Sequence, residues 1–260
     1  MINLKRLKHI MSLRQILGFS SIISAVLLWY IVSMFVSPLF VPSPKEVFLG
    51  SYDLYKEILM TSILFTFFRV VTGFLIGSAL GILVGVAMSW NRFIQWVLDP
   101  IIELIRPIPV IALIPLFILW IGLGETSRII IIVFASFVVL VINTREAIKN
   151  VPMAYINAAQ TLGASTKARI FRTVILPAIT PEIIVGIRIA VAASFDLAAA
   201  AEFIGAQRGL GYIIINAKKF LYTNGIVFGV FLFTLLAWLA NIIIRYFDKR
   251  VNIWTERGKA

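Results

Sequence analysis

The chain has 260 residues, of which 60% are hydrophobic and 14% are charged, whereas soluble domains average about 45–50% and about 25%. Its mean hydropathy is +0.98. A globule of this size in water could not bury so much apolar surface, so the composition excludes a soluble enzyme and indicates a protein whose solvent is largely lipid. The formal net charge of +12 could indicate a nucleic-acid partner. The positions of the charges relative to the apolar stretches decide whether it does.

The residue inventory excludes several chemistries. Cysteine is absent and His9 is the only histidine, so disulfides, thiolate nucleophiles, Cys/His zinc sites and haem ligation are not expected. His9 lies among lysines and an arginine near the N-terminus and is interpreted as a solvated tail residue. No metal and no cofactor bound by this chain are predicted.

Six apolar stretches predict transmembrane helices, because each is long enough, or nearly so, to cross about 30 Å of hydrocarbon. They cover residues 17–37, 61–88, 107–124, 129–143, 183–201 and 225–244. The first is longer than the apolar region of a secretory signal, which predicts a retained span. No stretch alternates with the period of a barrel strand, so the predicted fold class is all-α, a polytopic membrane protein with about six transmembrane helices.

The positive charges predict the orientation. Of the 24 lysines and arginines, 16 fall on the side of the N-terminus, 6 on the other side, and Arg69 and Arg188 within spans. By the positive-inside rule both termini are expected in the cytoplasm, and no nucleic acid is needed as a partner. One domain, 1–260, is expected, comprising a cytoplasmic basic tail 1–16, spans one to four within 17–143, a cytoplasmic loop 144–180, spans five and six within 181–246, and a cytoplasmic tail 247–260.

Two spans carry small residues at every fourth position. The second span has Gly73, Gly77, Gly81 and Gly85, and the fifth has Gly186, Ala190, Ser194 and Ala198. Such stripes let helix backbones approach closely in lipid. They predict either a tightly packed bundle or a dimer seam. Between these spans, Pro107, Pro109 and Pro115 predict a kinked third span, because proline lacks the amide donor that a helix interior needs.

Three charges lie within the predicted spans. Arg188 and Asp196 are eight residues apart on the face of the fifth span opposite its small-residue stripe, and Arg69 lies in the second span. Charges at membrane depth are costly and are expected to face a cavity or a partner. They are therefore interpreted either as a substrate or gating site, or as structural ion pairs with other helices, with snorkelling of Arg188 to the interface as a further reading.

The loop 144–180 has the pattern of two short amphipathic helices. Apolar residues recur at helical spacing on both sides of Gly163, and Lys167, Arg169 and Arg172 supply a basic face. This pattern is typical of a docking element for a cytosolic partner, or of a segment that lies on lipid headgroups.

The motifs of this chain resemble those of permease subunits of ABC-type importers. The run Asn157-Ala-Ala-Gln-Thr-Leu-Gly-Ala-Ser165 followed by Ile175-Leu-Pro177 resembles that family's coupling loop. Three further stretches resemble the nitrate/sulfonate/taurine/bicarbonate branch: residues 107–116, Trp120-Ile-Gly-Leu-Gly124, and Ala201-Glu202 with Gly209-Leu-Gly-Tyr212. The resemblance covers roughly residues 60–250.

This resemblance implies a transporter subunit of the prokaryotic plasma membrane rather than an enzyme. It implies a homodimer, two cytoplasmic ATP-binding subunits that use ATP and Mg²⁺, and an extracytoplasmic solute-binding protein; the sequence itself has no phosphate-loop motif. Contact with the ATPase is expected at Asn157, Ala158, Ala159, Gly163 and Lys167. The solute implied is a small anion of the sulfonate, taurine or nitrate type, with a vitamin or pyrimidine precursor as the alternative.

Two departures from the family pattern concern the loop. Asn157 stands where the family has an acidic residue, and the interval from Gly163 to Pro177 is one residue longer. Because one residue rotates a helix by about 100°, the extra residue is expected in a turn or as a changed presentation of the second helix.

Other function classes are disfavoured by the sequence. An ion-coupled carrier would predict inverted repeats and buried acids, and Asp196 is the one acid expected to be buried. A membrane enzyme would have almost no catalytic side chains available, and a channel would be expected to show a filter sequence.

Overall fold

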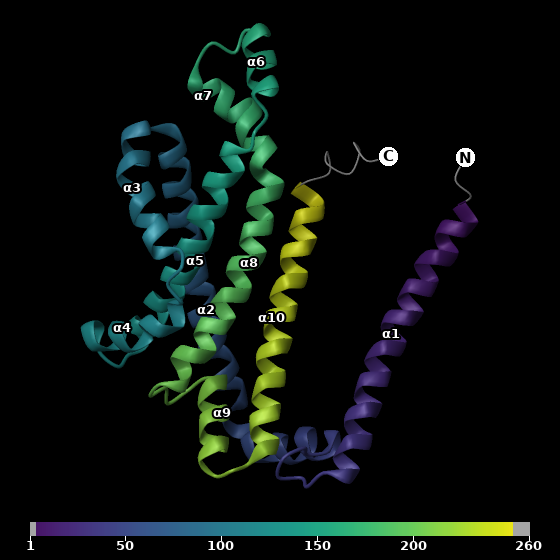
Figure 1. Ribbon diagram of the computed structural model, residues 1–260. Helices are drawn as coiled ribbons and strands as arrows, with labels where there is room; N and C mark the ends of the chain where they lie inside the picture. Colours follow the sequence, from purple (N-terminus) through teal and green to yellow (C-terminus); the bar gives the residue numbers. More distant parts are fainter. Residues whose placement is uncertain (1–3, 252–260) are drawn as a thin grey trace. The chain divides into compact units, whose positions relative to one another are not determined.

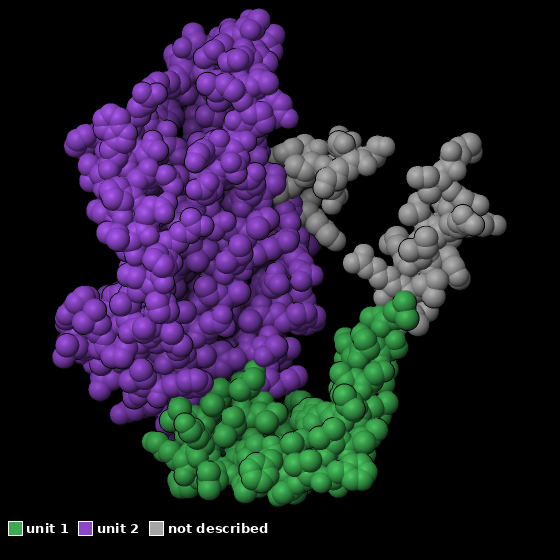
Figure 2. Space-filling model, in the orientation of Figure 1, with its two compact units in different colours: residues 1–60, 213–230 green, residues 61–212, 231–260 purple. Residues whose placement is uncertain are grey.

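The computed structural model describes the backbone of residues 4–251, which forms helices and no strand. Figure 1 shows the helices in chain order. The last part of the expected C-terminal tail, 252–260, lies outside the described residues. The chain divides into two compact units, residues 1–60 with 213–230 and residues 61–212 with 231–260 (Figure 2). The single domain expected from the sequence stays a prediction.

Five helical stretches in the described part of the chain are long and apolar enough to cross a membrane. They are Leu17–Phe35, Glu46–Trp90, Glu125–Lys149, Lys167–Phe203 and Thr223–Asp248. A sixth exists if Arg92–Ile105 and Val110–Ile121, which are bent by 90°, count as one span. The prediction of an all-α protein with about six spans is therefore confirmed.

The third predicted span differs most from the structure. In place of one helix over 107–124, α3 (Arg92–Ile105) is followed by the 3₁₀ turn η2 (Val110–Leu113) and the eight-residue α4 (Ile114–Ile121). Pro109 is extended, with φ −68° and ψ 106°. Two prolines at 107 and 109 deny amide donors to one turn, so the chain bends here instead of kinking gently.

The first unit contains α1 (Leu4–Phe35), the π-helical turn η1 (Glu46–Gly50), and parts of three further helices whose remaining residues belong to the second unit. Helix α1 begins inside the stretch expected as a tail. The Trp29 indole donates to the Pro42 carbonyl at 3.0 Å, and Ser43 donates through its amide and hydroxyl to the Glu46 carboxylate at 2.9 Å. These bonds fix the turn that follows α1.

The second unit is built around α5 (Glu125–Lys149) and α8 (Leu176–Phe203), which pack along each other. The buried hydroxyls of Ser136 and Ser194 lie 2.8 Å apart across this seam. A methyl group at Gly186 would lie 3.0 Å from the Cβ of Asn143 on α5. The small-residue stripe of the fifth span thus faces another helix of the same chain.

The glycines of α2 (Ser51–Trp90) face α5 as well. A methyl group at Gly73 would lie 2.6 Å from the Cβ of Ile132, and one at Gly81 would lie 2.8 Å from the carbonyl oxygen of Phe137. A methyl group at Gly77 would collide with the carbonyl oxygen of Val133, and one at Gly85 would lie 2.8 Å from the Cβ of Thr144. Because the glycines place no side chain between α2 and α5, even an alanine at any of these four positions would require the helices to shift apart. Of the two readings of the stripes, the geometry is that of packing within one chain.

The segment after α5 has two helices, but only the first is separate. Helix α6 (Met153–Thr161) ends in a turn at Gly163, and α7 (Lys167–Ile170) runs through the π-helical turn η3 (Phe171–Ile175) directly into α8. The expected loop 144–180 therefore includes the end of α5 and the start of α8. The π turn lies between Gly163 and Pro177, the interval in which the resemblance predicts one extra residue, and a π turn accommodates such a residue within a helix.

Helix α9 (Leu210–Lys219) and helix α10 (Thr223–Val251) are the last two helices of the described residues. In the first unit, the hydroxyl of Thr223 donates to the carbonyl of Leu39, and the rings of Phe48 and Phe228 meet edge to face at 6.5 Å.

Candidate functional site

The turn between α6 and α7 is a helix C-cap that requires glycine. Gly163 has φ +92°, the amide of Ala164 donates to the carbonyl of Ala159 at 2.9 Å, and the amide of Gly163 donates to the carbonyl of Gln160 at 3.0 Å. This pair of bonds is the Schellman motif, in which the residue after the cap is left-handed. The hydroxyl of Thr166 then caps α7 by accepting from the amide of Arg169.

Helix α6 presents nearly its whole surface to the outside. It has no buried residue, and Asn157, Ala158 and Lys167 are exposed while Ala159 is half-buried. The same segment exposes 68% of Met153 and 86% of Leu162. Exposed apolar side chains on a short helix rimmed by basic ones are typical of a protein- or lipid-docking surface.

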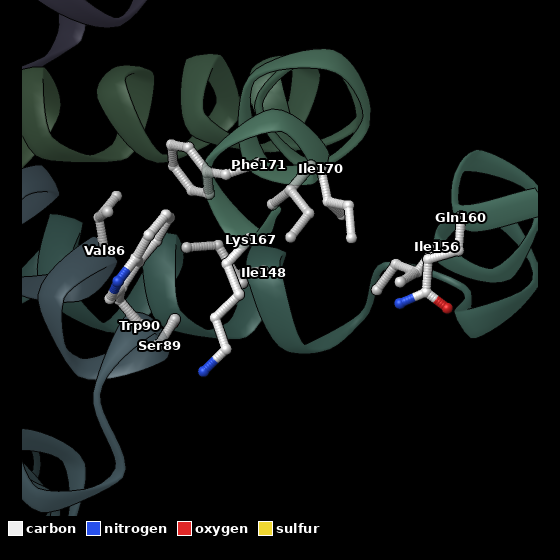
Figure 3. Close-up of a pocket in the computed structure, with 10 residues that line it drawn as sticks. Val86, Ser89, Trp90, Ile148, Ile156, Gln160, Lys167, Ile170 and Phe171 are labelled. Atoms are coloured by element: carbon white, nitrogen blue, oxygen red, sulfur yellow. The ribbon is translucent and has the colours of Figure 1, made fainter. Parts of the chain in front are cut away.

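A cavity of about 260 Å³ lies behind this segment (Figure 3). Its walls come from the end of α2, the end of α5, from α6, and from α7 with the π turn. Trp90 of α2 and Phe171 of the π turn meet edge to face, with centroids 5.4 Å apart. Through this contact, a displacement of α7 would press directly on the end of α2.

The opposite end of α5 holds a buried network centred on Arg69. Two of its donors bind Glu125, with Nε to Oε2 at 2.6 Å and Nη2 to Oε1 at 2.7 Å. Its Nη1 donates to Oε1 of Glu202 at 2.7 Å and to the carbonyl of Arg208 at 2.8 Å. Arg69 and Glu202 are each 1% exposed. This fork-shaped recognition of carboxylates fixes α2, α5, α8 and the following loop to one another.

Backbone and hydroxyl donors complete the network. Thr66 donates to Glu202 at 2.8 Å and accepts from the amide of Leu210 at 2.9 Å, while the amide of Gly211 donates to Glu202 at 2.8 Å. Gly209 has φ +121°, and a methyl group there would lie 2.6 Å from Nη1 of Arg69. The Gly-Leu-Gly sequence is needed because this backbone wraps directly around a buried ion pair.

The three charges singled out from the sequence lie in three different places. Arg69 lies in the network just described, with four hydrogen bonds to protein groups. Arg188 pairs with Asp248 on α10, and Asp196 is exposed on α8 in the single chain. The expectation that Asp196 is the one buried acid is wrong, because Glu202 is buried.

The sequence alone did not single out the side chains that bind to Arg69 and to one another in this network. Glu202 was noted only within a motif, and Glu125 and Thr66 were not singled out. A usable signal existed, because a lone arginine in an apolar span needs an acid and Glu202 stands at the end of an otherwise apolar span. Among the described residues, no group of three His, Cys, Asp or Glu side chains could hold a metal ion.

Comparison with known proteins decides the family. Residues 73–253 match the model of the binding-protein-dependent transport system inner membrane component. The chain belongs to this family. It is therefore a multi-pass inner-membrane transport component and not an enzyme.

Individual relatives cover nearly the whole chain. It is 35% identical over 240 residues to the taurine transport system permease protein TauC of Escherichia coli, covering 88% of this chain and 87% of the relative. It is 29% identical to the putative aliphatic sulfonates transport permease protein SsuC of Bacillus subtilis, covering 94% and 84%. It is 28% identical to the formylaminopyrimidine transport permease protein ThiX of Halalkalibacterium halodurans, covering 89% and 93%.

A solved structure shares the fold. The inward-facing MetNI methionine ABC transporter matches with a TM-score of 0.65 at 20% identity, covering 76% of this chain and 98% of the matched chain. At this identity the match shows the fold alone.

Proposed function

We propose that this chain is the permease subunit of an ATP-driven importer for small sulfonates of the taurine type. The observation that carries the substrate class is the 35% identity to TauC over 88% of the chain. The identity to SsuC supports the same class. The identity to ThiX favours a pyrimidine precursor as the second candidate.

The α6–α7 segment, residues 153–170, would couple the bundle to a separate ATPase. Its support is the exposure of α6, the rigid glycine cap at its end, and the contact of Phe171 with Trp90. Asn157, Ala158, Ala159, Gly163 and Lys167 would form the docking centre. A basic partner on the ATPase is not required at Asn157, because a carboxamide can donate or accept a hydrogen bond but carries no charge.

The assembly that we propose is a homodimer of this chain with two ATP-binding subunits and an extracytoplasmic solute-binding protein. ATP and Mg²⁺ would be held by the partner chains. The α6–α7 segment and both termini would lie in the cytoplasm, as the distribution of lysine and arginine predicts. Arg188, which is half-exposed in its pair with Asp248, and Asp196 would line or gate the path. Arg69 would hold the helices in position, because it is buried and bound by two carboxylates.

The coupling role is tested by changing the glycine cap. A residue with a Cβ atom in the left-handed backbone conformation costs about 1–2 kcal/mol, and among such residues asparagine tolerates this conformation best. Gly163→Val should therefore reduce ATPase association and ATP-driven taurine uptake at least about fivefold, with the amount of inserted chain unchanged. Gly163→Asn is the matched control and should stay near the wild type.

The outcome that removes the assignment is equally specific. A Gly163→Val transporter with normal ATPase association and normal uptake would leave the α6–α7 segment without a coupling role. Uptake of a pyrimidine precursor, with no uptake of taurine or alkyl sulfonates by the wild type, would replace the substrate class and leave the coupling role in place.

A further inference from the structure

A second cavity lies beside the arginine network, at the end of α5 remote from the α6–α7 segment. It measures about 390 Å³. Its walls are Phe65 of α2, the first turn of α5 with Glu125 and Arg128, and the loop after α8 with Gln207 and Arg208. All of these residues belong to the second unit. Since α5 has 25 residues, this cavity and the α6–α7 segment are about 37 Å apart along that helix.

The carboxylates at this cavity are already bound by other groups of the protein. Glu125 gives both oxygens to Arg69, and Arg128 approaches Oε1 of Glu125 at 3.3 Å. Glu202 is enclosed by Thr66, Arg69 and the amide of Gly211. In this cluster, three arginines at 69, 128 and 208 face two carboxylates. One positive charge is left over, and the positive end of the α5 dipole adds to it.

The two arginines that line the cavity have donor capacity to spare. Arg128 is 7% exposed and its buried Nε has no hydrogen-bond partner. Arg208 is exposed, and no carboxylate among the described residues lies within ion-pair distance of it. Its guanidinium lies over the ring of Phe65, with Cζ 5.4 Å from the centroid. Stacking of this kind holds a guanidinium in place while leaving its edge free to bind.

We infer that Arg128, Arg208 and Gln207 form a binding site for the head group of a small organic anion, of the sulfonate class, on its way into the bundle. The guanidinium fork matches an oxyanion with two or three equivalent oxygens, and Gln207 adds amide donors at the exposed rim. Glu125 lies beside this site, but both of its oxygens are bound by Arg69, so the head group is bound by the arginines and Gln207. The assignment rests on the proposed function for its place in transport.

The test is direct binding to the assembled transporter in lipid nanodiscs, without the solute-binding protein. The probe is trifluoromethanesulfonate, whose ¹⁹F line broadens on weak binding. Arg208→Gln should weaken binding about tenfold, the loss expected for one charge-assisted hydrogen-bonding group. Arg208→Lys should recover most of it. Arg92→Gln removes another exposed arginine of the same unit and should leave binding unchanged.

Two results would overturn the site. One is an Arg208→Gln complex that binds the probe as the wild type does; the other is an equal loss in Arg92→Gln, which would mean a general effect of surface charge. Taurine uptake in proteoliposomes separates the two proposals. Normal uptake with unchanged probe binding in Arg208→Gln removes the site and keeps the function. Arg208-dependent probe binding without any sulfonate uptake keeps the site and removes the substrate class.

Discussion

At the scale of single residues, the network around Arg69 is the main determinant of structure at one end of the second unit. Its guanidinium joins α5 and α8 through Glu125 and Glu202, and both Arg69 and Glu202 are almost fully buried. A buried pair is only weakly favourable when complete but costly when one partner is removed. Its role is therefore to specify one arrangement of the helices and of the Gly209–Gly211 backbone around them.

Removing the charge of Glu202 should be strongly destabilising. Glu202→Gln leaves the buried guanidinium of Arg69 with one carboxylate, and we expect the free energy of unfolding to fall by about 3 kcal/mol. The change in the free energy of unfolding is measured by SDS-induced unfolding of the purified chain in mixed detergent micelles. Glu182→Gln, an exposed acid on the same helix, serves as the control and should change stability by less than about 0.5 kcal/mol. Equal stability of the two variants would contradict a structural role for the network.

At the scale of secondary-structure elements, the close contact of α2 with α5 depends on the absence of side chains at one position in four. Gly73, Gly77, Gly81 and Gly85 all face α5. In lipid there is little hydrophobic drive between helices, so the contact is stabilised by packing at short distance. A single methyl group therefore acts on the whole pair of helices.

Gly81→Ala should destabilise the second unit by about 1–3 kcal/mol, the usual cost of overpacking. The added methyl group would lie 2.8 Å from the carbonyl of Phe137 and 2.9 Å from the Cβ of Leu140. The same substitution at Gly18, which has no atom within 4 Å of its Cβ position, should be neutral or slightly stabilising. The two variants are compared in the same SDS unfolding measurement, and a neutral Gly81→Ala would contradict the close packing.

The π turn Phe171–Ile175 sets the angle between α7 and α8. Deleting Thr173 should convert this turn to α-helix and rotate α7 by about 100° relative to α8. Phe171 would then leave Trp90, so we expect normal insertion but at least about fivefold lower ATPase association. Thr173→Ala keeps the chain length and should behave as the wild type. Normal ATPase association in the deletion variant, measured by co-purification, would show that the turn has no part in coupling.

At the scale of the whole molecule, the sequence predicts the helices that are continuously apolar. It does not predict the structure where single residues determine a bend or a long-range contact. The spans 61–88, 183–201 and 225–244 all lie within observed helices, because apolar length alone requires a helix in lipid. The third span is wrong because prolines break it within one turn. Glu202 was missed because its partner is 133 residues away, a pairing that local pattern cannot supply.

We propose that this chain couples a transport bundle to an ATPase, and one purification tests this coupling. The tagged chain is extracted in a mild detergent from its native membrane, and the mass of the complex is measured by native mass spectrometry. We predict two copies of the 29.1 kDa chain together with two copies of an ATPase that carries a phosphate-loop motif. A monomer or homo-oligomer without any ATPase, even after crosslinking through Lys167, would contradict the claim.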